Sequence, residues 1–329
     1  MRALVTGSNG FVGRHIVRYL RRRGDTVIGV DDLSTGLRYQ EWPSPMYLWS
    51  DYLDHFHHMD VREFFRTIEP AEPYDLIFHC AAVVGGRLKI EGDPLAVATD
   101  LSIDAEFFNW AVRLDPKPKR VVYFSSSAVY PTLLQSRDTN CALSEGFVTF
   151  DTGRIGMPDQ TYGWSKLSGE YLARVAAHKY GLPVVIYRPF SGYGEDQDMS
   201  YPFPALIERV VNVAEKPMVV WGSGQQQRDF IHIDDVVEAV FASMDRMRVG
   251  ETLNLGSGEG TSFEKLVQLA GRLLLPYDFD VVYDTTKPEG VFSRVADTYN
   301  LGRYYVPKIS LEEGIRRVAR HLDKVRQPA

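Results

Sequence analysis

The chain opens with a short apolar segment that runs into three closely spaced glycines. Residues 2–6 (Arg-Ala-Leu-Val-Thr) have the composition of a buried strand, residues 7–13 are Gly-Ser-Asn-Gly-Phe-Val-Gly, and residues 11–20 are amphipathic. Glycines allow a tight turn and close approach of a ligand to the backbone, and the following helix start offers unpaired N–H groups to a phosphate. This order predicts the first unit of a dinucleotide-binding α/β fold.

The glycine spacing, GxxGxxG, differs from the common GxGxxG, and an ordinary strand-to-helix turn is the alternative interpretation. A second predicted strand at residues 26–30, ending in two aspartates, favours the dinucleotide. The residues expected to bind the cofactor at this turn are Gly7, Asn9, Gly10, Phe11, Val12 and Gly13.

The two aspartates after the second strand, Asp31 and Asp32, are expected to face the adenosine half of the cofactor. A carboxylate at Asp31 would accept hydrogen bonds from the ribose hydroxyls and repel a 2′-phosphate, which predicts NAD over NADP. Arg38 is close in sequence, so NADP stays the alternative. Asp60 and Val61 begin a predicted helix and are expected to contact the adenine.

Three histidines, His55, His57 and His58, raise the question of a metal site. Their spacing matches no standard ligand motif, and no clustered cysteine or second histidine group would complete a site. We therefore predict a polar loop here and no bound metal.

Small and polar residues follow the next predicted strands. The strand at residues 76–79 ends near Ala81 and Ala82, which leave space for a dinucleotide against the sheet, and Gly86-Arg87 forms a flexible basic turn near the same edge. The strand at residues 120–124 ends in three serines at 125–127. Their hydroxyls are candidates to bind a substrate hydroxyl, the alternative being a strand end that caps itself.

A tyrosine and a lysine four residues apart, Tyr162 and Lys166, lie in a predicted helix. Positions i and i+4 share one helix face, so the ammonium is expected to favour the phenolate and lower the tyrosine pKa. Such a phenolate can take the proton of a sugar hydroxyl while the carbon loses hydride to a dinucleotide. Chance matches to Tyr-x-x-x-Lys are common, so a surface tyrosine beside a solvated lysine is the alternative.

The charge balance argues against two classes of partner. The chain has 37 Lys+Arg and 43 Asp+Glu, a net charge of −6, which does not favour a nucleic acid or an anionic membrane. No apolar run approaches 18 residues, and the two cysteines lie far apart, outside any CxxC pattern. A cytoplasmic, unanchored protein without disulfides is expected.

The order of elements predicts an α/β fold, a Rossmann-type doubly wound parallel sheet with a smaller α/β C-terminal substrate domain. The NAD-binding domain is expected to span residues 1–187, and the later segment at about 234–255 is expected to return to this domain. The substrate domain is expected to comprise residues 188–233 and 256–329, beginning where the regular βα alternation ends.

Taken together, these segments resemble the extended short-chain dehydrogenases, the family of NAD-dependent nucleotide-sugar epimerases and dehydratases. The resemblance extends over nearly the whole chain and includes residues 7–13, 125–130, 188–194, 228–230 and 254–258. It implies a Rossmann domain, a nucleoside-diphosphate sugar (GDP- or UDP-hexose) as substrate, and a homodimer formed by two helices of each subunit, here 100–114 and 162–180.

Within this family, three segments resemble the branch of GDP-mannose 3,5-epimerases and GDP-fucose synthases: residues 81–86, 129–131 and 288–297. This alignment implies Ser126 as the catalytic serine, with Ser127 beside it. It also implies that Arg228 and Arg294 contact the diphosphate or nucleotide, the alternative being surface salt bridges.

The chain departs from that branch at several positions. Ala128 stands where a cysteine exchanges protons next to the ketone, and residues 195–201 contain no Lys or Arg to act as its partner. Asp100 replaces the usual asparagine in the dimer helix, and Ser191 replaces an asparagine of the sugar pocket. Ser127-Ala128 also lacks the acidic residues that family dehydratases and decarboxylases carry in this loop.

The residues that remain support hydride chemistry without an extra acid/base pair. We expect Tyr162 as the base, Lys166 beside it and Ser126 at the reacting oxygen, with net 4-epimerisation through a transient 4-keto sugar. The alternatives are a 3,5-epimerase, a net sugar 4-oxidase or ketosugar reductase, and a non-enzymatic dinucleotide-sensing module.

Overall fold

The structure is a computed structural model. It describes residues 1–38, 53–83, 87–139, 141–151, 155–214 and 217–326, with the side chains of residues 87–89 and 324–326 left out.

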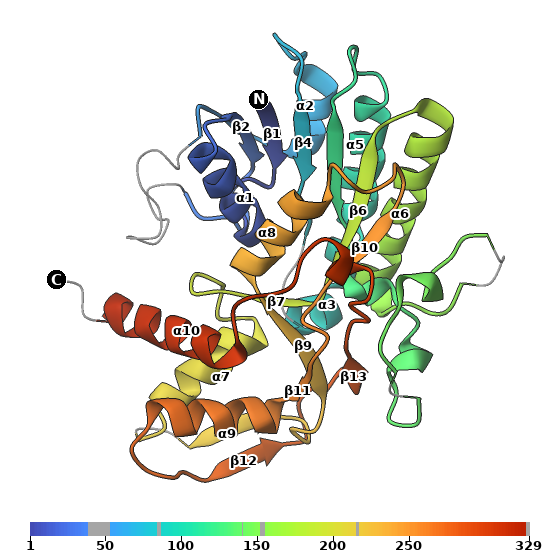
Figure 1. The fold of residues 1–329 in the computed structure, drawn as a ribbon. Helices are drawn as coiled ribbons and strands as arrows, with labels where there is room; N and C mark the ends of the chain where they lie inside the picture. The colour runs from blue at the N-terminus through green and yellow to red at the C-terminus, as the bar shows by residue number, and fades with distance from the viewer. Residues whose placement is uncertain (39–52, 84–86, 140, 152–154, 215–216, 327–329) are drawn as a thin grey trace.

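Seven parallel strands form the central sheet (Figure 1). Their order across the sheet is β10-β6-β5-β4-β1-β2-β3. The strands are β1 (Arg2–Thr6), β2 (Thr26–Asp31), β3 (His55–His58), β4 (Leu76–His79), β5 (Arg120–Phe124), β6 (Val184–Pro189) and β10 (Thr252–Leu255). Each neighbouring pair is parallel, so the predicted Rossmann-type α/β fold is confirmed.

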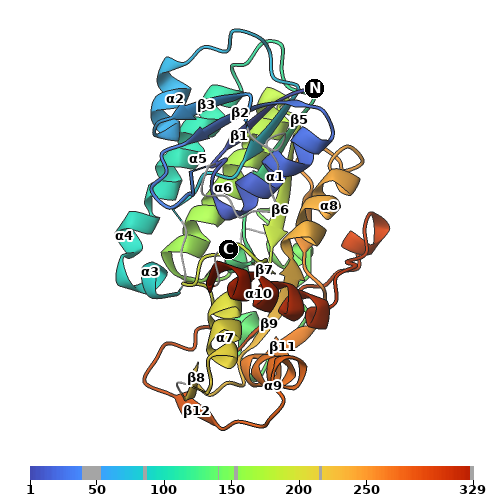
Figure 2. The same cartoon turned by 90° about the vertical axis from the view of Figure 1, so that its left-hand side faces the viewer.

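Helices cover both faces of this sheet, as Figures 1 and 2 show. One face packs on α1 (Phe11–Arg22) and α8 (Ile233–Ser243). The other packs on α2 (Val61–Thr67), α5 (Thr99–Ala111) and α6 (Gln160–Tyr180), and short helices α3 (Arg87–Gly92) and α4 (Pro94–Val97) precede α5. The central strands are apolar because both faces are buried.

The prediction of a polar loop at the three histidines is wrong. His55–His58 is strand β3, at the edge of the sheet, where it pairs with β2 in the register Ile28↔His55 to Asp31↔His58. An edge strand tolerates polar side chains because one edge and part of a face meet solvent. His57 packs against the ring of Phe64 in α2, with centroids 5.0 Å apart. Among the residues that the structure describes, no group of His, Cys, Asp or Glu is arranged to hold a metal.

A smaller unit follows β6 and lies below the large sheet in Figure 1. Its second sheet has the order β11-β9-β13, with β7 also paired to β9, while β12 pairs with β8. Its strands are β7 (Ser191–Tyr193), β8 (Met218–Trp221), β9 (Gln227–His232), β11 (Gly260–Ser262), β12 (Val281–Asp284) and β13 (Ser293–Arg294). Helices α7 (Pro202–Val211), α9 (Phe263–Leu274) and α10 (Leu311–Arg326) share a core with them.

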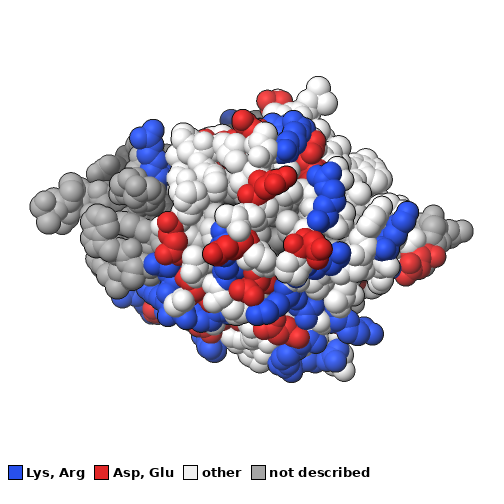
Figure 3. Space-filling view, turned by 90° about the horizontal axis from the view of Figure 1, so that it is seen from above, with Lys and Arg blue, Asp and Glu red and all other residues white. Residues whose placement is uncertain are grey.

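Three short 3₁₀ turns lie between β5 and α6, namely η3 (Ser127–Val129), η4 (Thr132–Gln135) and η5 (Glu145–Phe147), and η6 (Leu301–Arg303) lies between β13 and α10. Basic and acidic side chains are interspersed over the face seen in Figure 3. Within the described residues, no helix is long and apolar enough to cross a membrane.

Candidate active site

The glycine turn fits tightly between β1, β4 and α1. Gly7 has φ 65°, and a Cβ atom there would lie 2.7 Å from the backbone nitrogen of Ala81. A Cβ atom on Gly13 would collide with the carbonyl oxygen of Gly7. No side chain caps the start of α1, and its first turn carries no acidic residue. The turn is thus a cradle of backbone atoms at a positive helix end, which suits a pyrophosphate.

Asp31 is buried at the end of β2, where its carboxylate accepts hydrogen bonds from the backbone N–H of Asn9 (2.9 Å) and of Leu33 (2.8 Å). A carboxylate has about four lone-pair sites, so acceptor capacity remains for ribose hydroxyls. Burial raises the pKa of Asp31, against the lowering effect of these backbone N–H groups. Asp32 is exposed and accepts from the N–H of Ser34.

The remaining predicted cofactor residues lie at neighbouring strand ends. Asp60 caps α2 by accepting the N–H of Arg62 at 2.8 Å, and Arg62 lowers the pKa of that carboxyl. Val61 is buried, and Ala81 and Ala82 follow β4 beside the glycine turn. Gly86 and the Arg87 side chain lie outside the described part of the structure.

Tyr162 and Ser126 meet because α6 packs unusually closely on η3. The glycine after the tyrosine, Gly163, has no side chain, and a Cβ atom there would collide with the carbonyl oxygen of Ala128. The same carbonyl accepts the N–H of Asp159, the N-cap residue of α6, at 2.9 Å. At this contact the Ser126 hydroxyl lies close enough to the Tyr162 phenol to lower its pKa. Lys166, one turn further along α6, is buried.

The charges around Tyr162 partly oppose one another. Burial raises the pKa of Tyr162, and although Lys166 and the Ser126 hydroxyl lower it, the net shift is upward. Lys166 thus lowers the Tyr162 pKa as expected, but desolvation outweighs this attraction in the net shift. Burial disfavours charged Lys166, but Asp104 and Asp100 outweigh burial and raise its pKa.

A buried polar network lies behind Lys166. The Asp104 carboxylate accepts the Tyr123 hydroxyl at 2.5 Å and contacts His79 Nε2 at 3.2 Å, while His79 Nδ1 lies 2.7 Å from the Thr6 hydroxyl. Sequence reasoning missed Asp104. Its only signal was the i, i+4 spacing from Asp100, which puts both carboxylates on one face of α5.

The predicted substrate residues are spread over several elements. Ser127 is buried in η3, and Ser191 lies in β7, half-buried. Arg228 donates to the carbonyl oxygen of Val291 at 2.9 Å. Arg294 donates to Asp159 at 2.8 Å and to Gln135 at 2.6 Å, so it contacts the N-cap residue of α6. Arg294 is therefore connected through Asp159 to the helix that carries Tyr162 and Lys166.

Sequence reasoning also missed a second tyrosine. Burial raises the pKa of Tyr201, the residue before α7, and Tyr162 raises it further. Tyr201 belongs to the segment 195–201, which contains no Lys or Arg.

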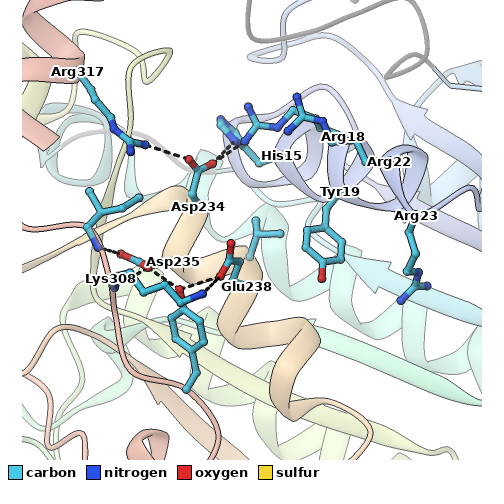
Figure 4. Close-up of a pocket in the computed structure, with 13 residues that line it drawn as sticks. His15, Arg18, Tyr19, Arg22, Arg23, Asp234, Asp235, Glu238, Lys308 and Arg317 are labelled. Atoms are coloured by element: carbon cyan, nitrogen blue, oxygen red, sulfur yellow. Dashed lines mark hydrogen bonds and ion pairs between the residues drawn. The ribbon is translucent and has the colours of Figure 1, made fainter. Parts of the chain in front are cut away.

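A separate cavity of about 600 Å³ lies between α1, α8 and the chain segment before and within α10 (Figure 4). Asp234 pairs there with Arg18 at 2.5 Å and with Arg317 at 3.4 Å, and Glu238 pairs with Lys308 at 2.6 Å. The residues that line this cavity include neither the glycine turn (residues 7–13) nor Tyr162, Ser126 or Lys166. Its acidic residues join the helices of the two units.

Comparisons with known proteins agree with this geometry. The NAD dependent epimerase/dehydratase family model matches residues 3–256. An uncharacterized UDP-glucose epimerase of Bacillus subtilis is 29% identical over 340 residues, covering 99% of each chain. GDP-mannose 3,5-epimerase of Arabidopsis thaliana is 27% identical over 95% of this chain and 79% of its own. UDP-glucose 4-epimerase of Thermotoga maritima, solved with UDP-glucose, superposes with TM-score 0.82 and 26% identity over 99% of this chain and 100% of its own.

Proposed function

Because the chain belongs to the NAD-dependent epimerase/dehydratase family, we propose that it interconverts the C4 epimers of a nucleoside-diphosphate hexose. The observation that carries this proposal is the contact between Tyr162 and Ser126 with Lys166 buried one turn away. A phenol beside an ammonium, with a serine hydroxyl next to it, is the arrangement needed to take a proton from a sugar hydroxyl. The similar UDP-glucose 4-epimerase of Thermotoga maritima supports it.

The cofactor of this family is NAD, and the residues present fit it. The glycine turn would hold the pyrophosphate, Asp31 would accept the adenosine ribose hydroxyls, and Asp32, Asp60 and Val61 would border the adenine. When bound, NAD supplies a hydride acceptor that can also return the hydride. Asp31 also gives the preference over NADP, since its carboxylate would repel a 2′-phosphate.

Three side chains act on the sugar in this proposal. Tyr162 takes the proton of the C4 hydroxyl, Ser126 donates a hydrogen bond to that oxygen, and Lys166 stabilises the phenolate. After the 4-keto sugar has rotated to present its other face, Tyr162 returns the proton to the same C4 oxygen, which now has the opposite configuration at C4. No net oxidation results.

The residue two positions after Ser126 supports 4-epimerisation over 3,5-epimerisation. Ala128 is buried, and its carbonyl packs against Gly163 of α6, so this position carries no group that exchanges carbon-bound protons. The resemblance to GDP-mannose 3,5-epimerase keeps that reaction as the second candidate. Net 4-oxidation, ketosugar reduction and dinucleotide sensing without turnover are further outcomes that the experiment separates.

We also propose a homodimer that packs α5 and α6 of each subunit together. Four large apolar side chains on these helices are exposed: Leu101 by 43%, Trp164 by 42%, Tyr171 by 53% and Tyr180 by 48%. Exposed apolar side chains on adjacent helices are typical of a protein interface.

We assign the enzyme to the cytoplasm, which fits the free thiols of Cys80 and Cys141.

Within this proposal the smaller unit, residues 188–233 and 256–329, binds the nucleoside diphosphate. The assigned substrate contacts are Gly86, Arg87, Ser126, Ser127, Ser191, Arg228 and Arg294. Arg294 is favoured over Arg228 because its hydrogen bond to Asp159 brings it to the start of α6.

Proton NMR in D₂O tests the reaction. The purified protein is incubated separately with UDP-glucose, UDP-glucuronate and GDP-mannose, and sugar products and deuterium incorporation are followed. A C4 epimer without deuterium on carbon supports the proposal. Deuterium at C3 or C5 would replace it with 3,5-epimerisation, and a stable ketosugar would indicate net oxidation. Tyr162→Phe is the control, which should abolish turnover and leave NAD binding intact.

A further inference from the structure

Two consecutive carboxylates after β7, Glu195 and Asp196, join the smaller unit to the helix of the glycine turn. We propose that Asp196 is a positioning residue that locks the smaller unit to α1 and thereby keeps NAD in the site until the epimer has formed. This inference rests on the proposed function and deepens it, because a reaction that takes a hydride from the sugar and returns it has to retain its cofactor.

Asp196 contacts α1 through both its side chain and its backbone. Its carboxylate accepts a hydrogen bond from Arg14 Nε at 2.6 Å and lies 2.8 Å from His15 Nε2, while its carbonyl oxygen accepts one from Arg14 Nη2 at 2.5 Å. All three residues are buried. Burial raises the pKa of Asp196, but His15 and Arg14 outweigh burial and lower it well below its ordinary value, so the carboxylate is charged. These contacts form a charged lock between the smaller unit and α1.

The neighbouring carboxylate holds the same segment to the smaller unit. Glu195 lies 3.1 Å from His232 Nε2, at the end of β9, and β9 pairs with β7. Within the segment, the Gln197 side-chain amide donates to the carbonyl oxygen of Gly192 at 2.9 Å. The backbone that carries Asp196 is therefore fixed to the second sheet, and the lock ties that sheet to α1.

Arg14 continues the connection into the glycine turn. Its Nη1 donates to the carbonyl oxygen of Asn9 at 3.3 Å, and the N–H of Asn9 donates to Asp31 at 2.9 Å. Gly194 packs against the same turn, since a Cβ atom on it would lie 3.1 Å from the Phe11 ring. The lock thus leads to the groups that would hold the pyrophosphate and the adenosine ribose.

A buried, hydrogen-bonded charge pair at an interface acts mainly on the rate at which the two sides separate. In the proposed function the larger unit holds NAD and the smaller unit holds the nucleoside diphosphate. If the units separated while the ketosugar rotates, the cofactor or the sugar could leave before the epimer forms. A lock that slows separation therefore favours epimerisation over loss of a ketosugar.

The test compares Asp196→Asn with the matched control Asp235→Asn. Both change a buried aspartate into an amide of the same size. Asp235 accepts the N–H groups of Lys308 and Ile309, at 2.9 and 3.0 Å, and so holds the segment before α10 (Figure 4). Each protein is loaded with radiolabelled NAD, and the rate of its dissociation into excess unlabelled NAD is measured without sugar.

We expect NAD to dissociate roughly 10-fold faster from Asp196→Asn, the effect of weakening one charged contact, and at the wild-type rate from Asp235→Asn. The inference is wrong if release from Asp196→Asn stays within about twofold of the wild type. It is equally wrong if Asp235→Asn releases NAD as fast as Asp196→Asn does, because that result would mean a general loosening of the fold.

A double variant covers the case in which the single change leaves too little folded protein. Arg14→Met combined with Asp196→Asn removes the lock without leaving the arginine charge unpaired, and buried ion pairs are often replaced by uncharged side chains without loss of stability. This variant should unfold at the wild-type temperature and still release NAD roughly 10-fold faster. Wild-type retention of NAD would assign the effect of Asp196→Asn to the unpaired charge and overturn the lock.

A product measurement connects the lock to the reaction. Asp196→Asn should release ketosugar together with one equivalent of NADH, since that sugar has lost a hydride and a proton that it does not regain. We expect the ratio of ketosugar to epimer to rise about 10-fold over the wild type, in parallel with NAD release. An unchanged ratio would overturn the role of the lock in turnover. If none of the three nucleotide sugars reacts with the wild type, the proposed function fails, while the NAD dissociation rates still decide the lock.

Discussion

Arg188 on β6 donates two hydrogen bonds to the Glu170 carboxylate on α6, at 2.8 Å from Nε and 2.6 Å from Nη2, and both side chains are buried. Glu170 lies one helical turn after Lys166 and also accepts the Ser125 hydroxyl at 2.5 Å. This pair joins α6, the helix that carries Tyr162, to strand β6. Through Ser125 it also joins α6 to the end of strand β5.

Removing one partner of this pair should destabilise the protein strongly. Glu170→Gln leaves the Arg188 charge buried without its counter-ion, so we expect the free energy of unfolding to fall by about 3–5 kcal/mol. Chemical denaturation followed by circular dichroism measures this change. The control is Arg174→Gln on the same helix, which breaks the exposed pair with Asp151 and should cost at most about 1 kcal/mol. Equal losses in the two variants would contradict the importance of burial.

The rate should depend on pH through Tyr162. Burial raises the pKa of Tyr162 and Lys166 lowers it, so deprotonation of the base, and with it kcat/KM, should increase as pH rises. Lys166→Met removes the largest lowering effect, and the rising limb should move to higher pH. We expect a loss of about 10²-fold at pH 7 that becomes smaller toward pH 10. The pH profile of kcat/KM measures it, and Lys166→Arg, which keeps the charge, should retain more of the low-pH activity. A loss independent of pH would contradict the assigned electrostatic role.

Cofactor preference should depend on Asp31. Asp31→Asn removes the negative charge but keeps the side-chain size and one carbonyl acceptor. We expect NAD affinity to fall by about 10-fold and the ratio of NAD to NADP affinity to fall further, because the repulsion of the 2′-phosphate is lost. Fluorescence titration with both cofactors measures this. An unchanged ratio would mean that another residue determines the preference.

The proposed dimer can be disrupted at α5. Leu101→Arg places a charge among exposed apolar side chains of α5 and α6, and a buried unpaired charge in an interface is costly. Light scattering after size exclusion should show a dimer for the wild type and a monomer for this variant. Val306→Arg changes an equally apolar residue, 68% exposed and outside these helices, and should leave the dimer intact. A wild-type monomer would refute this interface.

The sequence alone determined the elements whose signals are local. The glycine turn, the apolar strands on both sides of it and the i, i+4 spacing of Tyr162 and Lys166 depend on residues close in the chain, so spacing and composition were enough. The Rossmann-type sheet followed from the order of such elements.

Tertiary structure alone decided which groups meet. Three consecutive serines follow β5, and packing directs Ser125 to Glu170 and buries Ser127, while Ser126 reaches Tyr162 because Gly163 lets α6 approach η3. The strand at His55–His58 and the hydrogen bond of Arg294 to Asp159, which joins the smaller unit to α6, were also hidden. The reason is physical: an edge strand is stabilised by pairing with a distant neighbour, and contacts across two units depend on close packing, neither of which leaves a local pattern in the sequence.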